Sequence, residues 1–306
     1  MCIRDRDEEN KDGIELRAHL MRRAGFGATF KELENLNTEP YEQVVENLLH
    51  SKETNWMGDY MVRRFDNEAS GMINAPGSAR RWIYRMISSD TPLREKMTLF
   101  WHGVFATGVP KVINGRVLSD QIEMFRKYGM GRFDDLLINL AKDPAMIVWL
   151  DNQENHKDAV NENWGRELLE LFSMGVGNYT ETDVKECAKA FTGWTIGNVD
   201  YMMVRSKRDS DWPYGRIAYH FKYLDQDHDS RAKSFLGHSG DLDGADVIKI
   251  ICDEESTARF IARHLYHFFV ADEAAVPSWN KIGPRLSLIH ISEPTRPLYI
   301  SYAVFC

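Results

Sequence analysis

Apolar residues recur every three or four positions through most of the chain, which is the spacing of an amphipathic helix. The clearest stripe follows a proline and comprises Tyr41, Val44, Val45, Leu48 and Leu49. Residues with this spacing lie on one face of a helix and can be buried together. The pattern therefore predicts a succession of helices, each with one buried face, joined by short connectors.

Residue pairs that begin helices show where several of them start. Thr91-Pro92 and Asp143-Pro144 each place a capping side chain before a proline in the first helical turn. Thr180, followed three residues later by Asp183, resembles a capping box with Asp in place of Glu. Together with the apolar spacing, these signals predict helices at residues 15–23, 29–36, 41–49, 92–106, 145–150, 162–173, 180–193, 243–252 and 256–270.

Between about residues 194 and 236 the helical spacing gives way to short β-prone runs. Tyr201–Val204 and Ala218–Tyr223 are rich in aromatic and β-branched residues, and a polar stretch with Pro213 separates them. We expect a small β-hairpin insertion here. The predicted fold class is therefore mainly α, a multi-helix globular domain with a small β-hairpin-containing insertion.

Composition supports a globular protein and removes two functional classes. Of the 306 residues, 43% are hydrophobic and 27% are charged, and the formal net charge is −8. An acidic chain without a basic groove is a poor nucleic-acid binder, so we expect no nucleic-acid partner. No run approaches the roughly 18 consecutive apolar residues of a transmembrane helix, so we expect no membrane span in this chain.

The two ends of the chain differ in character from the part between them. Residues 1–6 (MCIRDR) and residues 286–306 resemble translated sequencing-adapter read-through in a metagenomic gene. We expect a single domain over residues 7–285, and we leave both end segments out of the fold argument. Cys187 and Cys252 then remain, and we expect both to be buried thiols on helices.

The sharpest local pattern lies in the predicted helix of residues 162–173. Its apolar arc consists of Trp164, Leu168, Leu171 and Phe172. At about 100° per residue, Asn163, Glu167 and Glu170 lie together on one flank of that arc. Glu167 borders the arc, and a partly buried carboxylate needs a cation, a proton or hydrogen-bond donors. Three interpretations stay open: an ion pair with Arg166 or Arg94, a ligand to a divalent metal ion, or a general acid or base.

His102 lies in the last turn of the predicted helix at residues 92–106. In the structural interpretation, the imidazole interacts with the helix dipole and a backbone carbonyl. In the functional one, His102 is a metal ligand or proton carrier, because imidazole titrates near neutral pH. No histidine follows four residues later and no HExxH motif is present, so the metal signal is weak.

A polar loop between two predicted helices is the favoured site region. Acidic and amide side chains end the helix before it and begin the helix after it. Such residues commonly cap helices, although clustered oxygens also suit a hard cation. The candidate binding residues are Asp151, Asn152, Asn161, Glu162, Asn163 and Arg166.

Several segments in order resemble one bacterial family. They are residues 19–27, 92–102, 143–146, 150–152, 161–163, 166–172, 175–177, 179–181, 192–194, 235–237, 243–244 and 257–262. Together they resemble the family known as domain of unknown function 1800. The resemblance implies a large helical bacterial protein that is exported to the periplasm or secreted. It also implies that the chain is truncated at its C-terminus. Because residues 1–6 resemble adapter sequence, we expect the native N-terminus to be missing, so that a signal peptide is not visible.

One departure from the family pattern concerns the segment around His102. The family pattern has a second histidine at the position of Val104. Its replacement weakens any two-histidine site.

Two functions follow as hypotheses. The first is a non-catalytic scaffold that binds a protein or an envelope polymer, with the polar residues serving as caps and buried ion pairs. The second is a hydrolase that uses His102 and Glu167, with Glu170 nearby and with or without a divalent metal ion between them. Replacing Glu167 by Gln separates the hypotheses, because only in the scaffold should the change lower stability.

Overall fold

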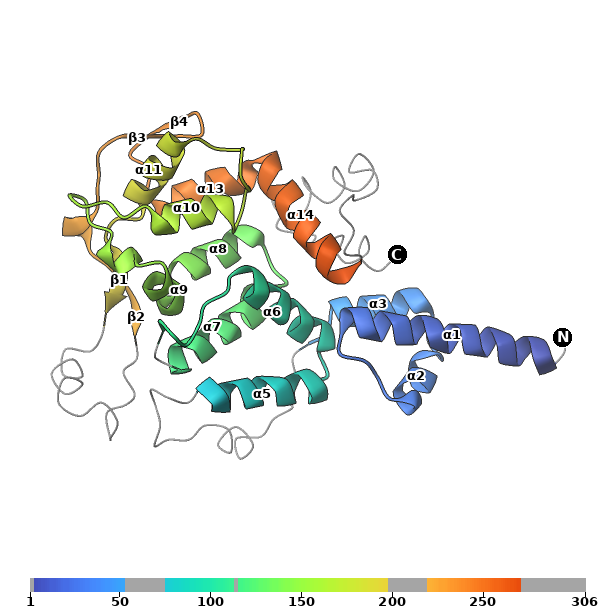
Figure 1. The fold of residues 1–306 in the computed structure, drawn as a ribbon. Helices are drawn as coiled ribbons and strands as arrows, with labels where there is room; N and C mark the ends of the chain where they lie inside the picture. Colours follow the sequence, from blue (N-terminus) through green and yellow to red (C-terminus); the bar gives the residue numbers. More distant parts are fainter. Residues whose placement is uncertain (1–2, 53–74, 113–114, 198–218, 271–306) are drawn as a thin grey trace.

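The computed structural model describes residues 3–52, 75–112, 115–197 and 219–270, and it confirms a mainly α-helical fold (Figure 1). The helices are α1 (Ile3–Ala24), α2 (Phe30–Leu36), α3 (Tyr41–Leu49), α5 (Ala75–Ser88), α6 (Pro92–Val104), α7 (Gly115–Tyr128), α8 (Phe133–Ala141), α9 (Pro144–Trp149), α10 (Asn163–Glu170), α11 (Glu181–Ala190), α13 (Gly244–Asp253) and α14 (Glu255–Phe269). The strands are β1 (Trp194–Gly197), β2 (His220–Tyr223), β3 (Lys233–Phe235) and β4 (His238–Gly240). Two 3₁₀ turns, η1 (Asn152–Glu154) and η2 (Asp225–Asp227), lie in the loops.

Side-chain caps fix several helix starts where the sequence predicts them. Thr180 and Asp183 form a complete capping box at α11. Asp143 caps α9 by accepting a hydrogen bond from the Met146 backbone N–H. Thr91 is a different case, because its side chain makes no capping hydrogen bond and lies 3.0 Å from the Ser89 hydroxyl instead. The proline after it therefore remains the stronger start signal for α6.

The predicted helix at residues 162–173 is shorter in the structure, and this changes its buried face. α10 ends at Glu170, and Leu171 beyond it is 52% exposed. The predicted arc members Trp164, Leu168 and Phe172 are buried. The prediction that Leu171 belongs to the apolar face is wrong, because the helix stops one residue before it.

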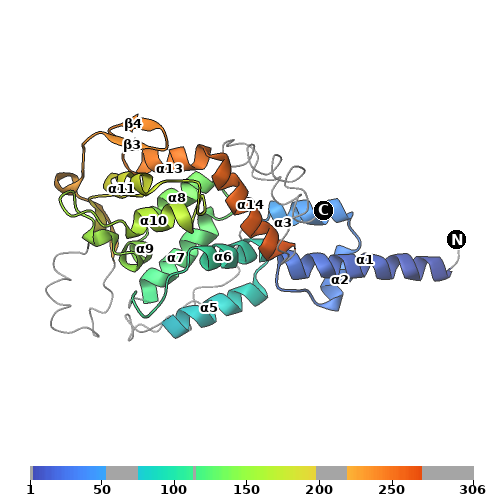
Figure 2. The same ribbon diagram turned by 45° about the horizontal axis from the view of Figure 1, so that its top comes forward.

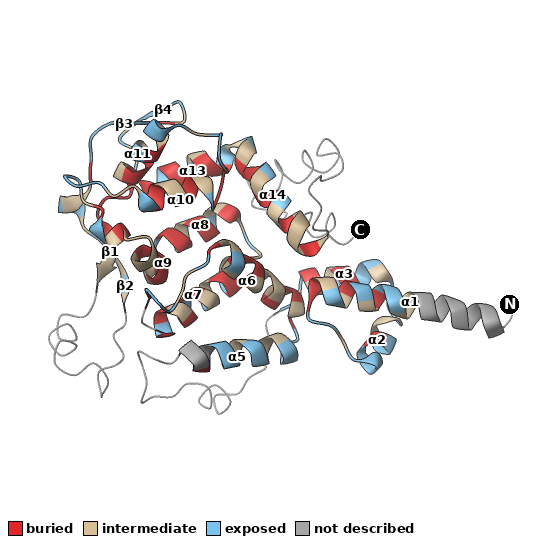
Figure 3. Ribbon diagram, viewed as in Figure 1, coloured by how far each residue is buried: buried red, intermediate tan, exposed pale blue. Residues whose placement is uncertain are grey.

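α7 packs against α5, α6, α8 and α9 (Figures 1 and 2). The core is built largely from α8 and α10, which bury Leu136, Leu137, Leu140, Leu168 and Leu169. Buried residues, red in Figure 3, lie along α6, α7, α8 and α9, whereas the described residues of α5 are mostly exposed or intermediate. Aromatic rings connect the layers: Phe105 stacks on Trp101 at 5.3 Å between centroids and meets Phe172 edge-on at 5.2 Å. Burying several aromatic side chains together is the main favourable contribution to such a core.

The helices α10 and α11 pack unusually close at Gly165. A Cβ atom at this position would lie 3.0 Å from the Ala188 backbone N and 3.1 Å from the Val184 carbonyl O. Only a residue without a side chain leaves room for the two backbones at this distance. This close approach sets the spacing between the helix that carries Glu167 and its neighbour.

The predicted β insertion is present, with two hairpins. β1 pairs with β2 in antiparallel register, Trp194 opposite Tyr223, whereas the predicted strand at residues 201–204 lies outside the described residues. β3 and β4 form the second pair. Leu236 and Gly237 join them with φ angles of 46° and 81°, the positive values that a two-residue hairpin turn requires. The second hairpin extends past residue 236, where the insertion was predicted to end.

Three further predictions concern the cysteines, a membrane span and the bounds of the domain. Cys187 and Cys252 are both buried, as predicted. None of the helices in the described ranges combines the length and apolar character needed to cross a bilayer. Residues 286–306 lie outside the described part, so the single domain over residues 7–285 stays a prediction.

Candidate functional site

The predicted polar loop folds into a relay of asparagine side chains. Asn152 is 3% exposed, and its amide donates to the carbonyl oxygens of Phe191 at 3.3 Å and Trp194 at 2.8 Å. Its own oxygen accepts a hydrogen bond from Asn155, which also donates to the Ala188 carbonyl at 2.8 Å. These bonds satisfy buried backbone groups of α11 and β1. The amide of Asn152 thus holds η1 against the start of the hairpin.

The same relay continues through the second half of the loop. The Asn161 backbone N–H donates to the Asn155 side chain at 2.9 Å. The Asn161 oxygen accepts from the Asn163 N–H at 3.0 Å, and its amide donates to the Asp151 carbonyl at 3.3 Å. The Asp151 carboxylate lies 2.7 Å from the Lys111 ammonium at the surface. The structure therefore brings these predicted binding residues together, in contacts that order the loop; ligand binding by them stays a prediction.

Arg166 forms its ion pairs with glutamates other than Glu167. Its guanidinium lies 3.1 Å from Glu162 and 2.8 Å from Glu181. Arg94, the other candidate partner of Glu167, donates to a backbone carbonyl of α7 at 3.2 Å. Within the described residues neither arginine makes an ion pair with Glu167, so the first interpretation of that carboxylate is not realised.

Glu167 carries a buried oxygen without a hydrogen-bond partner among the described residues. The atom is Oε2. Burial raises the pKa of Glu167, and repulsion from Glu170 adds to the rise while Arg166 opposes it. Glu170 itself accepts a hydrogen bond from the Tyr179 hydroxyl at 3.2 Å. A carboxylate in this environment is destabilising for the fold and favourable for proton transfer.

His102 lies in an aromatic environment on α6. Its ring meets the Trp82 ring edge-on at 5.1 Å and lies 6.5 Å from the Phe125 ring. The buried Nδ1 has no hydrogen-bond partner in the described part of the chain. Burial lowers the pKa of His102, so the neutral imidazole is the main form at pH 7.

The structure does not show His102 and Glu167 acting on each other. The ring neighbours of His102 come from α5 and α7, and the charges that act on Glu167 come from its own helix. Across the described ranges, no three His, Cys, Asp or Glu side chains are grouped so that they could hold a metal ion. Metal binding by this pair stays a prediction.

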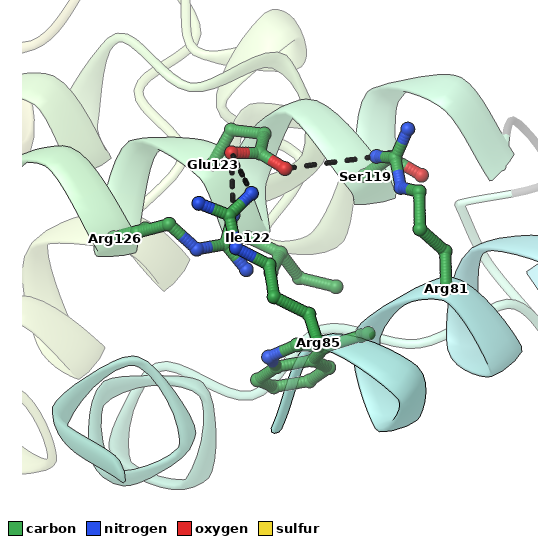
Figure 4. A pocket seen from close by; sticks show the side chains of 7 residues that line it. Arg81, Arg85, Ser119, Ile122, Glu123 and Arg126 are labelled. Atoms are coloured by element: carbon green, nitrogen blue, oxygen red, sulfur yellow. Dashed lines mark ion pairs between the residues drawn. The ribbon is translucent and has the colours of Figure 1, made fainter. Parts of the chain in front are cut away.

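A cluster of arginines and glutamates lies where α5, α6 and α7 meet, and we call it the arginine pocket. Glu95, which is 0% exposed, accepts two hydrogen bonds from Arg126, at 2.6 and 2.9 Å, and lies 2.9 Å from Arg85. Glu123 reaches the same arginines from the solvent side and also faces Arg81 (Figure 4). A cavity of about 10 Å³, the size of one water molecule, lies beside this cluster. It is lined by Arg81, Trp82, Arg85, Ser119, Ile122, Glu123 and Arg126.

Sequence reasoning missed the arginine pocket. Arg80 and Arg81 form an isolated basic pair in the sequence, although Arg85 follows Arg81 four residues later. Glu123 and Arg126, three residues apart on α7, complete the pattern. Charges at such spacings share one helix face, so the available signal was a basic face at Arg81 and Arg85 and a face with both signs at Glu123 and Arg126.

A larger groove lies between α1, α2, α3 and α5. Its volume is about 470 Å³. Its apolar lining includes Met21, Phe26, Leu36, Leu48, Met86 and Ile87. Three carboxylates, Glu32, Glu39 and Asp90, line it as well, and none of the described lining residues is basic. Hydrogen bonds from Thr29 lower the pKa of Glu32, so this carboxylate is ionised at neutral pH.

The fold and these surfaces define a mainly α-helical protein with a groove and a buried charged cluster, and they do not identify an activity. The comparisons with known proteins identify the family. A family model described as "Protein of unknown function (DUF1800)" matches residues 19–282. The chain belongs to this family. No curated protein and no solved structure matches the chain.

Proposed function

We propose that the chain is a partner-binding protein of the bacterial cell envelope, and that the groove between α1, α2, α3 and α5 receives a segment of a partner protein. The groove's volume of about 470 Å³ supports this, because it falls within the usual range for binding clefts, about 300–1,000 Å³. Phe26 and Ile87, which are 38% and 77% exposed, provide apolar contact area that a partner can cover.

Charge determines the chemistry of the proposed occupant. The groove is lined by carboxylates and apolar side chains, without a described basic residue. A segment that carries apolar side chains together with Lys or Arg complements this lining, whereas an anionic envelope polymer would be repelled by it. The proposal is therefore a basic, amphipathic protein segment rather than the polymer.

Two peptides of equal length and opposite charge test the groove. One has Leu and Lys, the other Leu and Glu, and fluorescence anisotropy measures binding of each to the purified chain. The basic peptide is expected to bind, and Ile87→Asp should weaken it. Val176→Asp is the matched control, because Val176 is also 77% exposed but does not line the groove.

Three results would overturn the groove proposal. They are equal binding of both peptides, equal effects of the two substitutions, and crosslinking from position 87 to the chain itself rather than to the peptide. A photoreactive amino acid at position 87 makes the third measurement.

Location in the envelope forms part of the same proposal and rests on the family resemblance. Fractionation of cells that make the full-length protein should recover it with a periplasmic or secreted marker. Recovery with the cytoplasmic marker alone would remove this part of the proposal and leave the groove untouched.

One observation favours a second candidate function, a hydrolase. Both Glu167 and His102 hold a buried polar atom without a described partner, and unfavourable groups of this kind collect at functional sites. Under this alternative Glu167 acts as general base and His102 carries a proton, with or without a divalent metal. Ester and peptide hydrolysis by wild type and Glu167→Gln is the assay. Full activity in the Glu167→Gln variant removes the alternative.

A further inference from the structure

We propose that the arginine pocket binds a small oxyanion, a carboxylate or phosphate group, and that Glu123 is the internal carboxylate which the ligand displaces. The site is separate from the groove of the proposed function and from the predicted polar loop. The cavity is lined by residues of α5 and α7, and α6 contributes the buried Glu95 behind the arginines. Glu123 and Arg81 are the two lining residues that the experiment changes.

One half of the pocket is fixed. Glu95 is completely buried and is held by Arg126 through two hydrogen bonds and by Arg85 at 2.9 Å. Arg126 is 3% exposed, so neither partner of this pair has room to move. A buried carboxylate therefore orients two guanidinium groups before any ligand arrives, which lowers the ordering cost of binding.

Glu123 forms the exposed side of the pocket, and its carboxylate is the group that a ligand replaces. The Glu123 side chain is 45% exposed, and its oxygens lie 3.7 Å from Arg81 and 3.8 Å from Arg85. These separations allow ion pairing without direct hydrogen bonds. Ion pairs at such distances contribute little, so the carboxylate can leave Arg81 and Arg85 at small cost. Its short contact with the buried Arg126 is the one that an entering oxyanion has to replace.

Two donors in the pocket lack a well-directed acceptor. The buried Nε1 of Trp82, which lines the pocket, has no hydrogen-bond partner among the described residues. Nη1 of Arg126 is in ion-pair contact with Glu123, but that contact lacks hydrogen-bond geometry. A buried N–H without an acceptor is costly, and an oxyanion supplies several acceptors at one point.

The cavity is too small to hold an oxyanion beside Glu123, so the ligand has to take the place of the Glu123 carboxylate. With Glu123 in place, about 10 Å³ is open, enough for one water molecule. When the carboxylate of Glu123 turns to solvent, the space of its head group joins this volume. The group that enters then has the size and charge of the group that leaves, which defines a carboxylate or phosphate head group.

Inorganic phosphate and acetate are the probes, with sodium chloride at equal ionic strength as the reference. Isothermal titration calorimetry measures binding to the whole chain. Glu123→Gln removes the internal competitor and should tighten binding of at least one probe about tenfold. Asp120→Asn removes a charge from the same helix, near Arg81 but outside the pocket lining, and should change the affinity less than about twofold.

Arg81→Gln, combined with Glu123→Gln, should abolish the gained affinity, and circular dichroism checks that each variant is folded. Tighter phosphate binding assigns the site to phosphate groups, and tighter acetate binding assigns it to carboxylates. Equal effects of Glu123→Gln and Asp120→Asn, or binding unaffected by Arg81→Gln, would overturn the proposal.

Discussion

Asp143 lies at the start of α9 in an environment that opposes its ionisation. It is 6% exposed, and Oδ2 accepts hydrogen bonds from Gln121 at 2.5 Å and from the Met146 N–H at 3.0 Å. Burial raises the pKa of Asp143 to about 7, although these hydrogen bonds oppose the rise. The Gln121 amide oxygen in turn accepts from Thr107, so the carboxyl group ends a short relay between three segments.

The raised pKa makes the stability of the fold depend on pH. Between the reference pKa of 3.8 and about 7, the unfolded chain loses the Asp143 proton while the folded chain keeps it. Folded stability therefore falls as pH rises through this window and levels off above it. Across the whole window the loss of stability amounts to about 4 kcal/mol, because each pH unit contributes about 1.36 kcal/mol.

Asp143→Asn removes this ionisation and keeps a capping oxygen. Urea unfolding, followed by tryptophan fluorescence from pH 4.5 to pH 8, gives the free energy of unfolding of both proteins. Relative to wild type, the free energy of unfolding of the variant should rise by about 3 kcal/mol between pH 4.5 and pH 8. Asp135→Asn is the control, because Asp135 is exposed in the first turn of α8. A difference between Asp143→Asn and wild type that stays constant with pH would refute the argument.

Glu167→Gln should leave the free energy of unfolding unchanged or raise it, because Oε2 loses no partner. A clear decrease in this free energy, measured by urea unfolding, would indicate a structural role for Glu167. Asn152→Ala should cost about 2 kcal/mol by leaving buried carbonyls unpaired, and an unchanged urea midpoint contradicts this. Arg166→Ala should cost less than about 1 kcal/mol, because its ion pairs are at the surface. Cys187 and Cys252, whose pKa values burial raises, should react with a thiol reagent only on unfolding.

The sequence predicts helices best where a local side chain fixes their start. The capping residues Asp143 and Thr180 place α9 and α11, and the stripe at Tyr41–Leu49 gives both ends of α3. α8 has no such signal, because its N-cap is Arg132, whose side chain makes no capping hydrogen bond. The helices predicted from the sequence do not include α8, although Phe133, Leu136, Leu137 and Leu140, all buried in the structure, recur at helical spacing.

In the candidate site, too, contacts between residues near in sequence could be predicted, and contacts between distant residues could not. The asparagines of the polar loop are adjacent in sequence, and their gathering could be predicted, although their partners at Ala188 and Trp194 could not. The arginine pocket joins residues 31 positions apart, Glu95 and Arg126. Such a pair depends on how α6 packs on α7, and no periodicity within one helix contains that information.

The close approach of α10 and α11 at Gly165 has a consequence for the evolution of the family. Because a Cβ atom at this position would meet the Ala188 backbone at 3.0 Å, the two sites share one fixed space between the helices. The atoms that a Cβ would meet belong to the α11 backbone, so no side-chain substitution at Ala188 or Val184 can make room for it. We therefore expect relatives to keep glycine at this position, and a larger residue there to widen the spacing between the two helices.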